Sequence, residues 1–129
     1  MSGRRVLVID DNVDSTDSMV TMLNLLGHVA QGAYSGKQGL DEAEVFLPDL
    51  VLLDLNMPDM DGFTVVRRLR ARFGDELMIA ALTGYGRRGD RRTTLETGFD
   101  AHLTKPVGLE QLQRVLSGGP ILRPGPVFR

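Results

Sequence analysis

Five polar residues follow the most apolar stretches of the sequence, and their types suit the binding of a phosphoryl group. They come after four separate runs and are Asp10, Asp11, Asp54, Thr83 and Lys105. Three carboxylates that lie close together repel one another unless a cation separates them, and hard oxygen ligands favour Mg²⁺ or Mn²⁺. A lysine ammonium opposite the cation would complete a clamp around phosphate oxygens. The set therefore predicts a magnesium-dependent site for phosphoryl transfer.

Asp54 is the residue that we expect to accept the phosphoryl group. It ends the apolar run that begins at Leu50, in what should be a central strand. A carboxylate can attack phosphorus and form an acyl phosphate, so the chain needs no other nucleophile. The sequence contains no cysteine, which excludes thiol catalysis and cysteine-based zinc sites. An aspartate after a strand is common, but one beside two further acids is costly without a function.

The other four residues also have simpler explanations. Asp10 and Asp11 could cap the helix that follows them, because Asp is favoured at helix starts. Thr83 could only end a strand, where a β-branched residue is favoured. Lys105 could be a solvated lysine near a turn, although Pro106 beside it restricts the backbone. Their joint placement after separate strands favours the functional interpretation.

The elements that must position these residues are visible as short apolar runs that alternate with amphipathic stretches. Continuous runs are typical of strands buried on both faces of a parallel sheet. They cover residues 6–9, 50–53 and 78–82, with weaker candidates at 28–31 and 101–104. We therefore predict an α/β fold with five β-α units, one parallel sheet and helices on both faces. Ligands of such sheets bind beyond the carboxyl ends of the strands, where the five polar residues lie.

Local signals mark where the predicted helices begin and end. Ser35 followed by Gln38 resembles a capping box that opens the second helix, whose apolar stripe runs on to Leu47. Gly27 and Gly74 stand where the first and third helices should stop. The fourth helix, near residues 88–98, has the weakest apolar stripe, and we expect it to be the most mobile.

Composition sets broad limits on the protein. The chain has 129 residues, of which 42% are hydrophobic and 25% charged, as expected for one globular domain. A net charge of -2 gives no overall attraction to nucleic acid or membranes, and no apolar stretch could span a bilayer, so we expect a cytoplasmic protein. Glycine and proline accumulate near the C-terminus. We predict a domain over residues 1–117 and a tail or linker over residues 118–129.

The sequence resembles the response-regulator receiver domains of two-component phosphorelay signalling over roughly residues 4–117. The matching motifs are Asp10-Asp11, the stretch Leu52-Leu53-Asp54-Leu55-Asn56-Met57-Pro58, Asp61-Gly62, Thr83-Gly84 and Lys105-Pro106. Five separated motifs in the right order are hard to obtain by chance. The stretch from Ala81 to Val107 is particularly similar to the receivers of hybrid histidine kinases.

This resemblance implies a fold, a chemistry and partners. The fold is a flavodoxin-like doubly wound sheet with strand order 2-1-3-4-5, and a cis peptide commonly precedes the proline that matches Pro106. The main-chain carbonyl of Asn56 would help Asp10, Asp11 and Asp54 to bind Mg²⁺. The phosphoryl group would come from a phosphohistidine of a sensor histidine kinase or a histidine phosphotransfer protein. Phosphorylation would switch a surface made by the fourth helix, the fifth strand and the fifth helix, and it can drive homodimer formation in such a protein.

Several residues are candidates for the switch itself. The resemblance implies that the Thr83 hydroxyl swings toward a phosphoryl oxygen and pulls the loop that begins at Gly84. We expect Tyr85 to overhang the site and shield the acyl phosphate from water, the alternative being a surface tyrosine. His102 departs from the family, which often has Tyr or Phe there. It could be a surface histidine on an edge strand or a ring that reports the switch, in which case its charge would couple signalling to pH.

Three other functions compete with this interpretation. Aspartyl-phosphate phosphatases of the haloacid-dehalogenase type need a second acid two residues after the nucleophile, where this chain has Asn56 and no room for a cap domain. A receiver-like module that is never phosphorylated would not need the five polar residues intact. The arginines near the fourth helix could bind nucleic acid, but no DNA- or RNA-binding motif accompanies them, and a solvated or partner-facing helix explains them better. They are Arg87, Arg88, Arg91 and Arg92.

Overall fold

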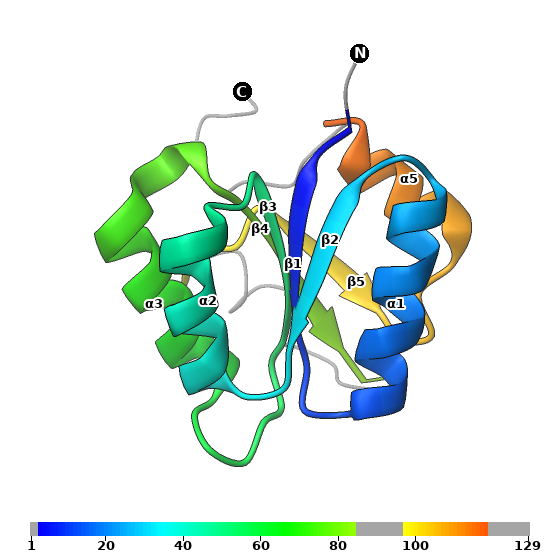
Figure 1. The fold of residues 1–129 in the computed structure, drawn as a ribbon. Coiled ribbons are helices and arrows are strands. Elements are labelled where there is room, and N and C mark those ends of the chain that lie inside the picture. Colours follow the sequence, from blue (N-terminus) through cyan, green and yellow to red (C-terminus); the bar gives the residue numbers. More distant parts are fainter. Residues whose placement is uncertain (1–2, 85–96, 119–129) are drawn as a thin grey trace.

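A parallel sheet forms the middle layer of the protein, with helices on both of its faces (Figure 1). The computed structural model describes residues 3–84 and 97–118. Among these residues the strand order is β2-β1-β3-β4-β5, which confirms the predicted order. The elements are β1 Arg5–Ile9, α1 Val13–Leu25, β2 Val29–Ala33, α2 Gly36–Phe46, β3 Leu50–Asp54, α3 Gly62–Phe73, the 3-10 turn η1 Gly74–Glu76, β4 Met78–Thr83, β5 Ala101–Thr104 and α5 Leu109–Leu116.

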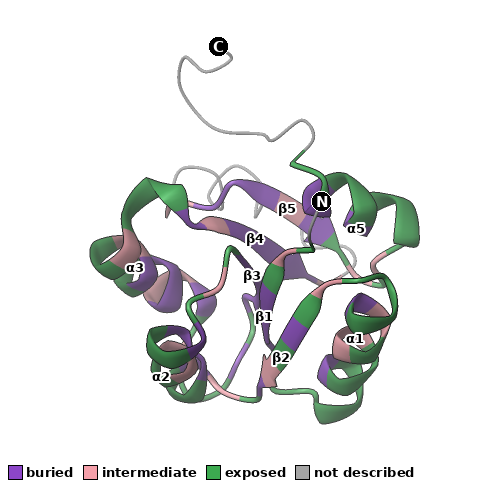
Figure 2. Ribbon diagram, turned by 45° about the horizontal axis from the view of Figure 1, so that its top comes forward, coloured by how far each residue is buried: buried purple, intermediate pink, exposed green. Residues whose placement is uncertain are grey.

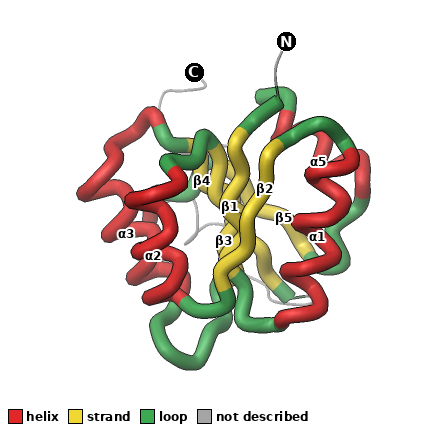
Figure 3. The backbone as a smooth tube through the Cα atoms, in the orientation of Figure 1, coloured by secondary structure: helices red, strands yellow, loops and turns green. Residues whose placement is uncertain are grey.

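The strands read as continuous apolar runs because both faces of the sheet are covered. Helices α2 and α3 lie on one face, and α1 and α5 lie on the other (Figure 3). Along β1, Leu7 and Ile9 join the core on the α2/α3 side, whereas Val6 and Val8 join the core on the α1/α5 side. Figure 2 shows buried strands between helices whose outer faces are exposed. The central strands β1 (from Val6), β3 and β4 therefore carry apolar side chains until they reach the carboxyl edge of the sheet.

The predicted helix signals are confirmed where they fall in the described residues. The Ser35 hydroxyl accepts a hydrogen bond from the Gln38 amide at 3.0 Å, and the Gln38 side chain accepts one from the Tyr34 amide at 2.8 Å. Gly27 and Gly74 have positive φ angles of 97° and 76°, which only glycine adopts without strain. These two glycines therefore end α1 and α3 as expected.

The predicted end of the second helix is wrong by one position. Leu47 does not continue the apolar stripe of α2: it has a φ of 53° and is 57% exposed. Pro48 follows it, and a residue before proline is disfavoured in the α conformation. Phe46 is buried in its place, and the Arg5 guanidinium lies 4.2 Å from the centre of the Phe46 ring. The last residue of α2 is thus in contact with the Arg5 side chain of β1.

The second strand is longer than its apolar pattern indicated. We expected residues 28–31, and β2 extends over Val29–Ala33 because its pairing with β1 continues to Ile9 and Ala33.

None of the helices in the described part of the chain is long and apolar enough to cross a bilayer. Tyr85, the four arginines and most of the predicted fourth helix (near residues 88–98) fall in residues 85–96, outside the described residues. The proposed tail from residue 119 onward also falls outside them, so the division into domain and tail stays a prediction.

Candidate functional site

The carboxyl ends of the strands bring the predicted acids together at the lower edge of the sheet in Figure 1. Asp10 follows β1 directly, and Asp54 is the last residue of β3. Each of Asp10, Asp11 and Asp54 offers a carboxylate oxygen, and these oxygens lie within 4.8 Å of one another. Asp10 and Asp54 are buried, whereas Asp11 is exposed to solvent. A ligand can therefore approach the cluster from the side of Asp11.

The two leading acids are not used as helix caps. Asn12 caps α1, because its side-chain oxygen accepts a hydrogen bond from the Ser15 amide at 2.9 Å. The Oδ1 atom of Asp10 accepts a local hydrogen bond from the Asn12 amide at 3.0 Å, and its Oδ2 atom accepts one from Lys105. The capping explanation for Asp10 and Asp11 is therefore wrong.

Lys105 reaches the acids from the end of β5. Its Nζ atom lies 2.9 Å from Asp10 Oδ2 and 3.5 Å from Asp54 Oδ2. The Lys105 amide donates to the main-chain oxygen of Thr83 at 2.8 Å, which fixes the end of β5 against β4. The peptide bond between Lys105 and Pro106 is cis, as the family resemblance implied. The solvated-lysine explanation fails, because the ammonium contacts two buried carboxylates.

The site carries more negative than positive charge, which shifts the pKa values of its groups. Burial raises the pKa of Asp54 from 3.8 to about 6; the Asn56 amide and the Lys105 charge oppose this shift, and Asp10 adds to it. Burial lowers the pKa of Lys105, but its hydrogen bond to Asp10 and the charges of Asp54 and Asp10 outweigh burial and leave that pKa raised. The Lys105 ammonium thus contacts two of the three carboxylates in the cluster. Such a set of oxygen donors fits a hard divalent cation such as Mg²⁺ or Mn²⁺.

The loop after Asp54 is held close to the cluster by its own turn. The Asn56 amide donates to Asp54 Oδ1 at 3.1 Å, and the Gly62 amide donates to the Leu55 carbonyl at 3.1 Å. A Cβ atom on Gly62 would lie 2.7 Å from the Leu55 Cα atom, so only glycine allows this approach. Asp61 caps α3 through the Thr64 amide at 2.9 Å. Asp61 and Gly62 therefore shape the turn into α3 and do not belong to the acid cluster.

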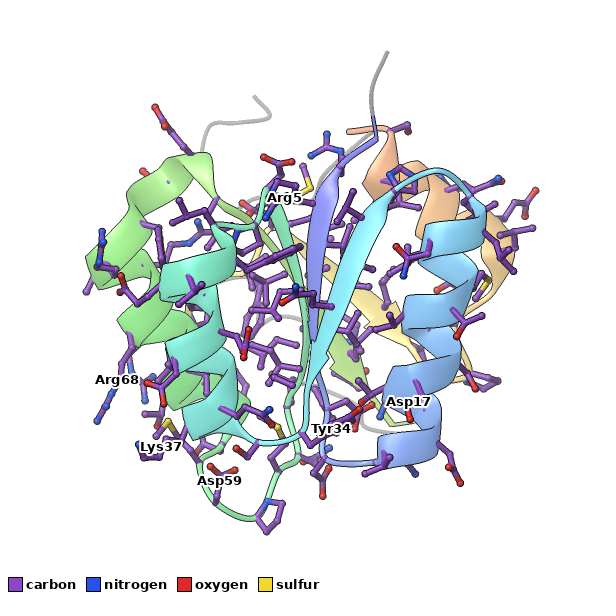
Figure 4. The ribbon with its side chains drawn as sticks, viewed as in Figure 1. Arg5, Asp17, Tyr34, Lys37, Asp59 and Arg68 are labelled. Atoms are coloured by element: carbon purple, nitrogen blue, oxygen red, sulfur yellow. The ribbon has the colours of Figure 1, made fainter. Side chains whose placement is uncertain are left out.

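A second aspartate in the same loop, Asp59, has a structural role that the sequence did not reveal. Asp59 accepts hydrogen bonds from the Gly36 amide at 3.1 Å and the Lys37 amide at 3.2 Å, both at the start of α2. Figure 4 shows Asp59 below the first turn of α2, near Lys37. These main-chain donors hold the pKa of Asp59 below its ordinary value. The loop that carries Asp54 is thus tied to a neighbouring helix, through partners too distant in sequence to be predicted.

Thr83 and His102 are neighbours at the other end of the site. Thr83 is 1% exposed, and its Oγ1 atom lies 3.0 Å from Nε2 of the partly buried His102. The Thr83 hydroxyl also lies 3.5 Å from the Leu103 carbonyl oxygen. Both partners belong to β5, the edge strand beside β4. His102 is therefore packed against a predicted switch residue and is not a solvated surface histidine.

A hollow beside the lysine gives access to the site. It has a volume of ≈ 360 Å³ and lies between the ends of β1 and β4, helix α1 and the turn after β5. Apolar side chains predominate in its wall. The residues that line it are Val8, Asp10, Ser15, Met19, Leu82, Lys105, Pro106 and Val107.

Comparison with known proteins identifies the family to which the sequence and the fold are similar. The chain matches the response regulator receiver domain over residues 6–117. It is 39% identical over 112 residues to an uncharacterised 14.6 kDa protein of Leptolyngbya boryana, and the match covers 86% of each chain. It is 38% identical over 108 residues to the response regulator MprA of Mycolicibacterium vanbaalenii, covering 84% of this chain and 46% of that protein. It is 37% identical over 110 residues to RpaA of Synechocystis, a DNA-binding transcriptional regulator, covering 84% of this chain and 45% of RpaA.

Solved structures agree with this result. A CheY-like receiver domain protein of Methanospirillum hungatei superimposes with a TM-score of 0.80 at 27% identity, covering 91% of this chain and 96% of that one. A provisionally named response regulator of Chloroflexus aurantiacus gives a TM-score of 0.81 at 28% identity, covering 88% of this chain and 95% of that one. The chain spans about half the length of the two larger regulators, MprA and RpaA, so their whole-protein activities do not transfer to it directly.

Proposed function

Because this chain belongs to the response regulator receiver family of two-component signalling, we propose that Asp54 accepts a phosphoryl group in a phosphorelay. The donor is a phosphohistidine on a sensor histidine kinase or a histidine phosphotransfer protein, since receivers of this family interact with sensor kinases. The observation that carries the proposal is the meeting of the Lys105 ammonium with the buried Asp10 and Asp54 carboxylates, at 2.9 and 3.5 Å. That arrangement has the charge and the access that phosphoryl transfer requires.

The transfer step is a displacement at phosphorus. A carboxylate oxygen of Asp54 attacks, the bond between phosphorus and the histidine nitrogen breaks, and an acyl phosphate forms. Lys105 is close enough to pair with a phosphoryl oxygen as it arrives beside Asp54. The residues that would hold Mg²⁺, or Mn²⁺, are Asp10, Asp11, Asp54 and the main-chain carbonyl of Asn56. A bound cation would supply positive charge that offsets the crowding of carboxylates and phosphoryl oxygens.

Asp54 must be ionised to attack. With its pKa raised to about 6, it is largely ionised at neutral pH even before a cation binds. A bound cation or a positively charged partner would lower that pKa toward its ordinary value, because either one stabilises the carboxylate. The raised pKa therefore indicates that the fold does not fully compensate the Asp54 charge, which a positively charged ligand would do.

The consequence of phosphorylation passes through Thr83. Its hydroxyl turns from β5 to a phosphoryl oxygen, and the loop that starts at Gly84 follows, with Tyr85 shielding the acyl phosphate. The switched surface comprises the predicted fourth helix, β5 and α5, and it binds an effector or a second copy of the chain. His102 modulates the change, and Pro106 holds Lys105 in place. The protein promotes its own phosphorylation and dephosphorylation, without an independent substrate.

Incubation with Mg²⁺ and acetyl phosphate, followed by mass spectrometry of the intact protein, tests the proposal. We expect an adduct of about 80 Da, the mass of one phosphoryl group, that requires Mg²⁺ and is lost in Asp54→Asn. Asp59→Asn, which changes an acid in the same loop but outside the cluster, should keep the adduct. An adduct that persists in Asp54→Asn, or that forms equally well with a metal chelator present, would contradict the proposal. Turnover of a small phosphate ester would instead support the phosphatase alternative.

A further inference from the structure

The hydroxyl of Thr83 is held by a histidine in a way that the sequence motifs do not specify. Thr83 pairs with Thr104 across β4 and β5, and His102 lies two residues before Thr104. Alternate residues of a strand share a face, so the His102 ring lies on the same face of the sheet as the Thr83 side chain. His102 itself pairs with the small, fully buried Ala81. The imidazole can therefore lean along the sheet until its Nε2 atom reaches Thr83 Oγ1 at 3.0 Å.

We infer that His102 is a positioning residue that holds the Thr83 hydroxyl against β5 until the acceptor aspartate carries a phosphoryl group. The inference rests on the proposed function, because it concerns how Thr83 responds to a group on Asp54. The two hydrogen-bond partners of Oγ1 in the described residues are His102 Nε2 and the Leu103 oxygen, and both lie on β5. The contact with Leu103, at 3.5 Å, is at the outer limit for a hydrogen bond. The imidazole is thus the main restraint.

The restraint does not depend on which ring nitrogen carries the proton. If Nε2 is protonated, it donates to Thr83 Oγ1; if it is not, the hydroxyl donates to Nε2. Either arrangement keeps Oγ1 on the side of β5. To reach a phosphoryl oxygen on Asp54, the buried Oγ1 atom must move away from β5, and this movement breaks the contact with Nε2 in either arrangement.

Loss of the contact should favour the phosphoryl-bound orientation. A neutral hydrogen bond inside a protein shifts an equilibrium by roughly twofold to tenfold. His102→Leu removes the hydrogen bond at similar volume, so it should strengthen binding of a phosphoryl mimic by roughly that factor. His102→Gln places an amide near the position of Nε2 and should bring the affinity back toward that of the wild type.

The experiment is a calorimetric titration of the full chain with beryllofluoride in the presence of Mg²⁺. Wild type, His102→Leu and His102→Gln are compared, first with Thr83 present and then in a Thr83→Val background. The effect of His102→Leu should disappear in Thr83→Val, because no hydroxyl remains to be held. Thermal unfolding of each variant, followed by circular dichroism, verifies that it is folded.

Three results would overturn the inference: unchanged affinity in His102→Leu, an equal effect of His102→Leu in the Thr83→Val background, or His102→Gln behaving like His102→Leu. Failure of the proposed function gives a different result. In that case the wild type would not bind beryllofluoride, or Asp54→Asn would bind it equally well. The two failures are therefore separated in one set of titrations.

Discussion

Two buried groups of charged residues lie at opposite edges of the sheet, and they are balanced differently. At the carboxyl edge, the acids Asp10 and Asp54 share the single ammonium of Lys105. At the other edge, Asp100 meets Arg70 at 2.7 Å and also accepts the Ile79 amide at 2.9 Å. The Arg70 guanidinium gives its remaining hydrogen bonds to the main-chain oxygens of Gly74, Leu77 and Gly98.

The difference separates a structural ion pair from the proposed phosphorylation site. The Asp100–Arg70 pair joins α3 to the segments that lead into β4 and β5, and its charges offset each other within the fold. The acid cluster has no such balance: burial, with a smaller contribution from the charge of Asp10, raises the pKa of Asp54 to about 6 although the Lys105 charge opposes the shift. Removing one partner of the matched pair should therefore destabilise the protein, whereas removing an acid from the unmatched cluster should relieve a cost that we attribute to ligand binding.

The largest expected effect comes from breaking the matched pair. Asp100→Ala leaves the Arg70 guanidinium without its carboxylate, and removal of one partner of a buried pair typically costs about 3–5 kcal/mol. The free energy of unfolding from urea denaturation measures this loss. An exposed pair that also involves α3 is the control: Arg72 Nε of α3 lies 2.8 Å from Glu44 Oε2 of α2, with side chains 58% and 46% exposed. Arg72→Ala should cost only about 0–1 kcal/mol. Equal losses in the two variants would contradict the distinction.

An intermediate effect, of opposite sign, is expected at the acid cluster. Asp54→Asn removes one of the repelling carboxylates, so the metal-free protein should become more stable at neutral pH, by about 1 kcal/mol because solvent screens part of the repulsion. Mg²⁺ should reverse the order, because it stabilises the wild type by binding the native state and stabilises Asp54→Asn less. Urea denaturation with and without Mg²⁺ measures both. A loss of stability in metal-free Asp54→Asn would mean that the cluster is balanced after all.

The pH dependence of this effect follows from the pKa of Asp54. That pKa is about 6 in the native protein, against 3.8 for an ordinary aspartate. Between these pH values the native protein binds more protons than the unfolded chain, so the stability from this group is fully present below about pH 4 and is lost as the pH rises through about 6. The difference in unfolding free energy between wild type and Asp54→Asn should therefore shift against the wild type between pH 4 and 7. A difference that stays constant over this range would show that the pKa is not raised.

The sequence predicted the acid cluster because every member follows an apolar run of a parallel sheet. Asp54 and Lys105 lie 51 positions apart in the printed sequence, yet their strands end at the same edge, so the fold class alone brings them together. The continuous runs also predicted the strand order once the family resemblance was added. These inferences depend on patterns that are local in the sequence.

The sequence did not predict contacts that depend on how distant segments pack. Arg70 and Asp100 belong to no motif, and nothing near either residue indicates its partner. The contact between Thr83 and His102 depends on the register of β4 and β5. The length of the segment that connects these two strands does not determine that register. Leu47 shows a third limit, because the apolar period of α2 continues through a residue whose backbone conformation Pro48 has already changed.

The smallest expected effect concerns Asp59, an exposed acid close to the site that belongs to the scaffold. It accepts the Gly36 and Lys37 amides at the start of α2, so Asp59→Ala should lower the free energy of unfolding by about 0.5–1 kcal/mol at pH 7. The pKa of Asp59 is lowered, so the stability from this group is present above its ordinary pKa and is lost as the pH falls. The cost of Asp59→Ala should therefore shrink toward pH 3, in the direction opposite to the Asp54 effect.

The matched variant for this last prediction is Tyr34→Phe, which removes another exposed hydrogen bond near the same edge. The Tyr34 hydroxyl donates to Asp17 at 2.6 Å, and Figure 4 shows the two side chains facing each other between the end of β2 and α1. Tyr34→Phe does not touch the start of α2, so it should not reproduce the acid-dependent loss of Asp59→Ala. Neither variant should reduce the phosphoryl adduct formed with acetyl phosphate, because neither residue contacts the acid cluster. If Asp59→Ala abolished that adduct while the protein remained folded, Asp59 would belong to the functional site. Charge balance within the fold would then not distinguish structural acids from functional ones.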